Sequence, residues 1–284
     1  MPRPPQGRFS SGAALIDNCK LQEASVHDKH LLVCFRPITQ ELDHFLHVHL
    51  GLYGVWNFTL IREPGLTPLD TSLLIAAGEG KPPQIIESPP RGAVRLRLIG
   101  EYAVADLNGP SRCEILTAEE VKILHARLGP DPLIKNSDPT PFIEKVRTSN
   151  RTIGELLMDQ KVISGVGNIY RAELLFRHRI HPLTPGCQVS IRKLRKFWSD
   201  AVVLLDKGKR TGVIVTVDDT VIEEPFTGWT KLAERASDEE ADLRWYTYRR
   251  NGRPCHQCKT LIAKASLANR TLYWCPRCQR KPKP

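Results

Sequence analysis

Four cysteines near the carboxyl end are spaced like the ligands of a metal ion. Cys255 and Cys258 form one CxxC pair, Cys275 and Cys278 form another, and 16 residues separate the two pairs. Each pair can present two thiolates on one tight turn, and two such turns joined by a β-hairpin close a tetrahedral site of four sulfurs. This donor set suits one structural Zn²⁺ and leaves no open position. A redox dithiol pair is the alternative, but the surrounding sequence lacks the βαβ pattern that it would need.

Arg270 lies just before the second cysteine pair, in the segment Arg-Thr-Leu-Tyr-Trp of residues 270–274. We expect Arg270 at the tip of the predicted hairpin. There its guanidinium can form two hydrogen bonds to a phosphate or enter a duplex groove. The alternative is that Arg270 is one surface arginine among many.

A glycine-rich turn forms the second candidate binding element. We expect a helix to end near Lys161, two tight turns over Ser164-Gly165-Val166-Gly167, and a helix capped by Asn168. The backbone N–H groups at a helix N-terminus form an anion site. The segment therefore fits a DNA phosphate, although glycine-rich turns before helices are common.

The distribution of charge favours a polyanionic partner. The net charge is +10, and residues 243–284 contain 11 Lys and Arg but no Asp or Glu, so the remainder of the chain is nearly neutral. Such a basic segment suggests nucleic acid, with a solvated basic tail as the alternative. No apolar run is long enough to span a membrane and the start does not resemble a signal peptide, so we expect a cytoplasmic protein.

The elements that must position these residues predict an α+β protein. Apolar residues alternate with polar ones over residues 46–50 and 94–98, which is typical of half-buried strands. A helix is expected over residues 118–128, and residues 129–132 break the chain. From residue 140 to 207 the pattern is helical, with a capping box at Thr152 and Glu155. We expect three domains: residues 1–128, 129–242 and 243–284.

Three segments together resemble the formamidopyrimidine-DNA glycosylase / endonuclease VIII family. They are residues 156–182, residues 128–133 (Leu-Gly-Pro-Asp-Pro-Leu), and the cysteine pairs with Arg270 before the second pair. The likeness runs from about Pro5 to Gln279 and is closest to the actinobacterial endonuclease VIII-like branch. It implies an amino-terminal β-sandwich, a helix–two-turn–helix domain and a carboxy-terminal zinc ribbon, with DNA in the cleft.

The resemblance also implies an activity. These enzymes remove oxidised bases from double-stranded DNA and cut the abasic strand by β- and δ-elimination, so the family function is a bifunctional DNA glycosylase/AP lyase. We expect a monomer associated with the nucleoid. Leu52 and Tyr53 favour oxidised pyrimidines as the lesion.

The resemblance assigns roles to individual residues. Lys29 matches the lysine of the β-domain, although Asp28 replaces the glycine that usually precedes it. Asn168 and Arg270 match the phosphate-binding pair. Leu52 and Tyr53 resemble the loop that fills the gap left by a flipped base, with an ordinary hairpin end as the alternative.

Three histidines, His44, His47 and His49, raise a separate possibility. His47 and His49 are expected on one side of a strand, where they could bind a metal. No third ligand is evident in the sequence, and the family does not use one, so we do not favour this hypothesis.

The first residues depart from the family pattern. Family members begin Met-Pro-Glu-Gly; the proline amine attacks C1′ of the sugar, and the glutamate acts as acid and base. Here Pro2 is followed by Arg3, and the amino-terminal helix and its glutamate are not seen. Three readings stay open: the true start lies upstream, the chain is a paralogue that binds damaged DNA without cutting it, or Pro2 acts in a rearranged site. Lys29 could supply weak lyase activity as a substitute amine.

Overall fold

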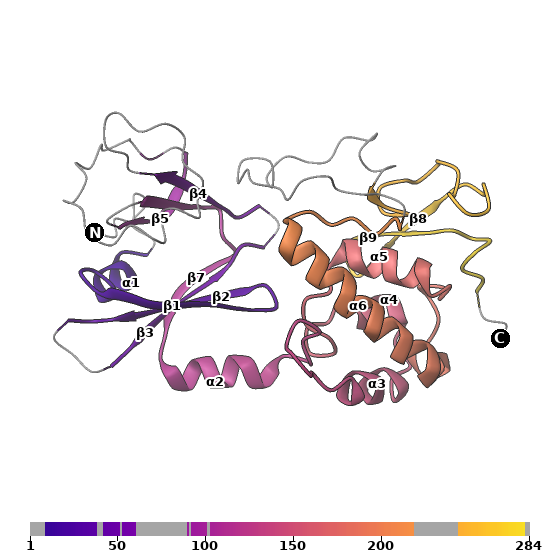
Figure 1. Cartoon of the computed structure of the whole chain (residues 1–284), viewed down its shortest axis with the longest axis horizontal. Coiled ribbons are helices and arrows are strands. Elements are labelled where there is room, and N and C mark those ends of the chain that lie inside the picture. The colour runs from indigo at the N-terminus through magenta and orange to yellow at the C-terminus, as the bar shows by residue number, and fades with distance from the viewer. Residues whose placement is uncertain are drawn as a thin grey trace. The chain divides into compact units, whose positions relative to one another are not determined.

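The computed structural model divides the chain into two compact units, Met1–Ile123 and Leu124–Pro284 (Figure 1). The structure describes residues 9–38, 42–51, 53–60, 90, 92–100, 103–218 and 244–281.

The first unit contains two antiparallel sheets. One has the strand order β1-β2-β3-β7 and the other the order β4-β6-β5. A short helix, α1, precedes the strands. The elements are α1 (Ser10–Leu15), β1 (Lys20–His27), β2 (His30–Arg36), β3 (His44–His49), β4 (Val55–Leu60), β5 (Val94–Ile99), β6 (Ala103–Asn108) and β7 (Arg112–Leu116).

The core of this unit lies between the two sheets, as predicted for a β-sandwich. Leu46 and Val48 of β3 are fully buried, and they belong to one apolar cluster with Leu96 of β5 and Leu107 of β6. Because successive side chains of a strand point to opposite faces, His47 and His49 share the other face of β3. Strands are therefore present over both stretches where alternation was predicted, although His47 and Arg97 among the polar residues are buried as well.

The second unit is mostly helical and ends in a hairpin. Its core surrounds α6, which buries Leu194, Phe197, Ala201 and Leu205 against the other helices. Among the described residues, no helix is both long and apolar enough to cross a membrane. The elements are α2 (Ala118–Arg127, which crosses the unit boundary), α3 (Thr140–Arg147), α4 (Ile153–Leu156), α5 (Asn168–Arg177), η1 (Gly186–Gln188), α6 (Ile191–Thr211), β8 (Ala263–Leu267) and β9 (Arg270–Trp274).

The predicted capping box is confirmed, but the helix that follows it is shorter than expected. Thr152 Oγ1 accepts a hydrogen bond from the Glu155 amide, and the Glu155 carboxylate accepts one from the Thr152 amide. The helix ends at Leu156, not near Lys161. The reason is local competition: Asp159 accepts hydrogen bonds from the amides of Lys161 and Val162, which closes a turn in place of another helical turn.

The β8–β9 hairpin has a two-residue turn. Ala268 and Asn269 adopt φ values of 50° and 57°, and Leu267 pairs with Arg270 across the turn. Two consecutive residues with positive φ match the right-handed twist of the flanking strands. Arg270 therefore follows the hairpin tip directly, as the sequence predicts.

Candidate nucleic-acid interface and metal centre

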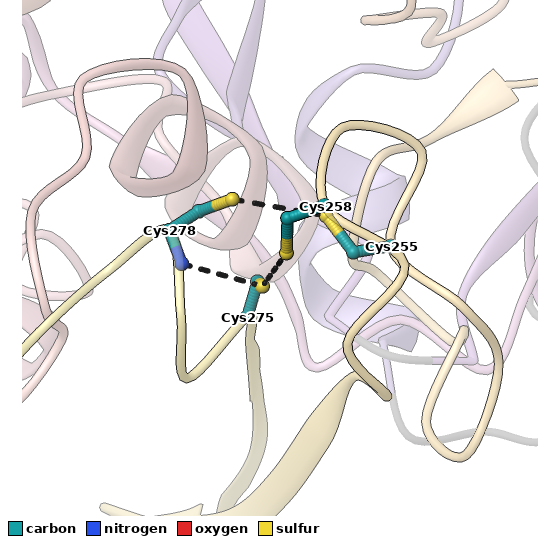
Figure 2. A group of neighbouring side chains, drawn as sticks. All are labelled: Cys255, Cys258, Cys275 and Cys278. Carbon is teal, nitrogen blue, oxygen red and sulfur yellow. Dashed lines mark hydrogen bonds between the residues drawn. The ribbon is translucent and has the colours of Figure 1, made fainter.

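The four paired cysteines converge on one point. The ligand atoms of Cys255, Cys258, Cys275 and Cys278 all lie within 4.8 Å of one another, and Figure 2 shows their side chains approaching from two loops. The Sγ–Sγ distances are 3.4 Å for Cys258–Cys275 and 3.9 Å for Cys255–Cys278. Sulfurs around a tetrahedral zinc are separated by about 3.8 Å. The donor set and its spacing thus fit a structural zinc ion, whose role is to close the ribbon of residues 251–281.

Gln279 links the turn of Cys275 and Cys278, which we call the zinc knuckle, to the helical part of the same unit. Its buried side chain accepts a hydrogen bond from the Cys275 amide at 2.9 Å and donates one to the Ile180 carbonyl at 2.9 Å. The rings of Phe176 and Tyr246 stack nearby at 4.9 Å between centroids. The metal centre is therefore anchored beyond the end of α5. No local sequence pattern indicates this role of Gln279, because its partner Ile180 is distant along the chain.

The turn before α5 is held in shape by one glutamine. The Gln160 side chain donates to the Val166 carbonyl at 3.0 Å and accepts from the Gly165 amide at 3.1 Å. Gly165 has a φ of +80°, which favours glycine. Gly129 packs behind the turn, and a Cβ there would lie 2.6 Å from the Val162 backbone. The glycine-proline stretch at residue 129 thus supports the turn as well as ending α2.

Asn168 does not cap α5, contrary to expectation. The N-cap is Gly167, and Asn168 is the first helical residue. Its side chain is engaged elsewhere: the amide nitrogen donates to the Thr271 carbonyl at 3.1 Å, and the amide oxygen accepts from the Arg171 guanidinium. Arg171 also donates to the Thr271 carbonyl, at 3.1 Å. These bonds join the start of α5 to the hairpin strand that carries Arg270.

Arg171 and Arg270 place two positive charges close together. Arg171 is fully buried, and burial, followed by repulsion from Arg270, lowers its pKa to about 10. Tyr248 lies beside them: burial is the main cause that raises its pKa, and its side chain hydrogen-bonds to Asn168. No carboxylate of the described residues forms an ion pair with either arginine. We call Asn168, Arg171, Tyr248 and Arg270 the phosphate clamp, because charged and neutral donors meet there with no anion to balance them.

The carboxylate of Glu173 holds in place the backbone segment that carries Tyr248 of the phosphate clamp. Its fully buried carboxylate accepts the backbone amides of Tyr246, Thr247 and Tyr248 at 2.7–2.9 Å. It also accepts the hydroxyls of Thr247 and Thr216. Tyr248 is thereby fixed over the helix that carries Asn168. Glu173 and Arg171 both lie within residues 156–182, but no local pattern in that segment indicates either role.

Of the residues predicted in the first unit, the structure describes Lys29 and Tyr53, which lie in the β1–β2 turn and the β3–β4 loop. Lys29 is exposed in the β1–β2 turn, next to Asp28, whose φ of +60° suits the glycine that the family places there. Lys29 and His49 line a mostly apolar hollow of about 430 Å³. Pro2 and Leu52 lie outside the described residues. The structure brings Asn168 and Arg270 together within the second unit, whereas Lys29 and Tyr53 belong to the first.

Tyr53 is presented by a tight loop between β3 and β4. Its side chain is 76% exposed. The Gly54 amide donates to the Leu50 carbonyl at 3.0 Å, and a Cβ on Gly54 would come within 2.3 Å of that oxygen. Gly51 has a φ of +71°. The loop therefore needs both glycines to hold an aromatic side chain in solvent.

The histidines form a hydrogen-bond relay rather than a metal site. His47, only 1% exposed, joins His30 at 2.7 Å and the Glu114 carboxylate at 2.9 Å. Among the described residues, the cysteine group is the one that could hold a metal ion. Burial, followed by the neighbouring histidines, lowers the pKa of His30 to about 4. His49 Nδ1 accepts a hydrogen bond from the Gly51 amide at 3.0 Å and lies 2.8 Å from Ser111 Oγ.

Comparisons with known proteins agree with this geometry. Residues 128–219 match the family model of the formamidopyrimidine-DNA glycosylase H2TH domain, and residues 252–280 match that of the zinc finger found in FPG and IleRS. The fold resembles a crystal structure of Lactococcus lactis Fpg bound to abasic-site DNA, with a TM-score of 0.72 and 19% identity, covering 99% of this chain and 91% of that one. At that identity the likeness concerns the fold alone.

Two curated relatives are closer in sequence. "Endonuclease 8 1" of Mycobacterium tuberculosis is 39% identical over 277 residues, which cover 97% of this chain and 90% of the relative. The formamidopyrimidine-DNA glycosylase of Methylococcus capsulatus is 34% identical over 197 residues, 68% of each chain. Identity of this level over nearly the whole length shows that the chain belongs to the formamidopyrimidine-DNA glycosylase / endonuclease VIII family.

Proposed function

We propose that this protein is a base-excision-repair enzyme, a bifunctional DNA glycosylase/AP lyase that removes oxidised bases and cuts the abasic strand by β- and δ-elimination. The observation that carries the proposal is the phosphate clamp. Asn168 donates a hydrogen bond to the carbonyl of Thr271, the residue after Arg270, so two residues more than 100 positions apart in sequence lie close together in a chain of this family. Double-stranded DNA with oxidised or abasic sites is the substrate class that such a clamp fits.

The phosphate clamp supplies the affinity for the sugar-phosphate backbone of DNA. Arg270 offers a forked cation, while the Asn168 amide and the Tyr248 hydroxyl offer neutral hydrogen bonds. Arg171 is buried and donates hydrogen bonds to the Thr271 and Gly154 carbonyls. It therefore holds Asn168 in place and does not itself contact the DNA. Phosphate contacts fix the register of a duplex but do not read its sequence, which suits an enzyme that must act at any lesion site.

The first unit supplies the chemistry at the sugar. An amine that attacks C1′ forms a Schiff base as the base leaves, and loss of a proton from C2′ then breaks the bond to the 3′ phosphate. Pro2 and Lys29 are the proposed amines. Lys29 and His49 line the same hollow. The exposed ring of Tyr53, with Leu52, is proposed to fill the space left by the flipped base.

Base release from defined duplexes tests this function. Duplexes that carry thymine glycol, 8-oxoguanine or no lesion are incubated with the protein, and the free base is quantified. We expect release from the damaged duplexes only, with thymine glycol preferred. Asn168→Ala should reduce release by at least about tenfold, and Asn57→Ala, an exposed asparagine on β4, should not. Binding of damaged duplex without release of any base would refute the proposed activity.

Some further properties are part of the same proposal. We propose that residues 1–128, 129–242 and 243–284 act as a catalytic β-sandwich, a helical DNA-binding domain and a zinc-ribbon finger. The protein is proposed to act as a monomer in the cytoplasm, in association with the nucleoid. Light scattering of the zinc-loaded protein would test the monomer, and a dimeric mass would contradict it.

A further inference from the structure

A second cationic hollow lies beside the zinc knuckle, on the second unit. Its volume is about 510 Å³. Four of its lining residues are cations from three elements of the chain, and its floor includes two of the zinc ligands. The lining residues are Arg179, Lys193, Gln257, Cys258, Arg277, Cys278 and Arg280.

This hollow is separate from the phosphate clamp. Asn168 is the first residue of α5, whereas Arg179 follows the other end of that helix. Ten helical residues span about 15 Å. Arg270 follows the tip of the hairpin, whereas Arg277 lies within the second cysteine pair and Arg280 comes just after it. A phosphate held by the clamp therefore does not occupy the hollow.

The charge of the hollow is not balanced by protein groups. No carboxylate lines it, and none of its four cations forms an ion pair with a carboxylate of the described residues. A zinc ion with four thiolates carries a charge of about −2, so the cations leave a surplus of about +2. Stabilisation of the zinc-bound thiolates therefore accounts for only part of the positive charge around the hollow.

The start of α6 adds positive charge where a helix disfavours it. Arg192, Lys193, Arg195 and Lys196 fall within the first two turns, and the first turn contains no acidic residue. Cations at a helix N-terminus oppose the helix dipole and destabilise the helix. A bound anion would offset this destabilisation. The Lys193 ammonium is held toward the hollow by the Arg179 carbonyl at 3.4 Å.

We propose that this hollow is a second anion site, which binds a linear oligophosphate of the triphosphate class. The surplus charge of the hollow, together with the further cations at the start of α6, suits a ligand that carries several negative charges. A hollow of about 510 Å³ has the size of a small-ligand site and admits a short chain of phosphate groups. The phosphate chain of a nucleotide and an inorganic polyphosphate share this chemistry.

Calorimetry with the zinc-loaded full chain tests the site. Sodium tripolyphosphate is the first probe; ATP and orthophosphate are the comparison probes, all at physiological ionic strength. We expect saturable binding of one tripolyphosphate per chain and binding of orthophosphate at least about tenfold weaker. Equal affinity for ATP would assign the site to nucleotides, and a clear preference for tripolyphosphate would assign it to inorganic polyphosphate.

Substitutions separate the hollow from the phosphate clamp. Arg179→Ala and Lys193→Ala, both outside the ribbon, should each weaken tripolyphosphate binding about tenfold and keep the full zinc content. Lys209→Ala, at the far end of α6, is the charge-matched control and should change nothing. Asn168→Ala with Arg270→Ala should leave the affinity unchanged. The proposal is overturned by an absence of saturable binding, by binding that only the clamp variant loses, or by loss of zinc from the Lys193→Ala protein.

Discussion

At the scale of single residues, the interface depends on how side chains far apart in sequence constrain one another. The sequence predicted Asn168 and Arg270 as DNA-binding residues from their place in motifs. It did not predict that Arg171 would be buried between them, because nothing local marks an arginine whose partners are the Gly154 and Thr271 carbonyls. It also gave Asn168 a capping role, which the contact with Thr271 replaces.

Arg270→Ala should weaken the binding of damaged duplex and flatten its salt dependence. Each cation that contacts a phosphate releases counterions, so removal of one contact should reduce the slope of log K against log salt by about one unit. Fluorescence anisotropy at several salt concentrations measures this slope. Arg210→Ala, an exposed arginine near the end of α6, removes the same charge and should leave the slope unchanged. An unaltered slope for Arg270→Ala would show that Arg270 does not contact phosphate.

The His30–His47–Glu114 relay should make the first unit sensitive to acid. Burial lowers the pKa of His30 from 6.5 to about 4. The folded protein thus binds fewer protons than the unfolded chain between these values, and its stability falls as the pH falls from 6.5 toward 4. Because His30 is half-exposed, the loss is on the order of 1 kcal/mol, or a few degrees in Tm.

Thermal melts at pH 7 and pH 4.5 test this dependence. His30→Asn should lose less Tm on acidification than the parent protein, and His44→Asn, on strand β3, is the control. An identical loss of Tm in the parent protein and His30→Asn would contradict the assignment.

At the scale of elements, the periodicity of apolar residues and the local capping residues predicted the strands and helices whose formation depends on nearby residues. The strands around residues 46–50 and 94–98, the helix from Ala118 and the capping box at Thr152 are all present. The end of α4 was missed, since a turn through Asp159 competes with the helix. The support that Gln160 and Gly129 give to the turn before α5 was also missed, because it arises from packing between distant segments.

Glu173→Gln should destabilise the second unit, because α5 is tied to residues 246–248 by one carboxylate. An amide can accept at only one oxygen and turns its NH₂ group toward backbone donors. We expect a loss of about 3 kcal/mol, or roughly 10 °C in Tm. Glu144→Gln, exposed on α3, should change Tm by about 1 °C or less. A Tm for Glu173→Gln within a degree or so of the parent value would show that the buried carboxylate is dispensable.

At the scale of the whole molecule, the cysteine spacing predicted the zinc ribbon, and the strand-like alternation followed by a helical pattern predicted the α+β class. The hydrogen bonds that join the ribbon to the helical part were not predictable. Gln279 bonds to Ile180, and Asn168 bonds to Thr271, in each case across about 100 residues of sequence. Such contacts depend on tertiary packing and not on any local pattern.

Removal of the zinc should therefore disable DNA binding as well as the ribbon. Without the metal, the hairpin loses its closure and the phosphate clamp loses the Thr271 carbonyl that orients Asn168. A chelator, or Cys258→Ala, should weaken the binding of damaged duplex more than about tenfold. Cys187→Ala, outside the cluster, is the control. Elemental analysis gives the zinc content, and full DNA affinity in a zinc-free protein would contradict this account.

The central claim is that the chain holds damaged DNA in the phosphate clamp and reacts with it through an amine. Borohydride trapping on a duplex with one abasic site tests this claim most directly, because reduction converts a Schiff base into a stable cross-link. We predict one protein molecule covalently attached per abasic strand, with the adduct mapped by mass spectrometry to Pro2 or Lys29 and its yield reduced by Arg270→Ala. Tight binding of the abasic duplex with no cross-link and no strand cleavage would contradict the claim.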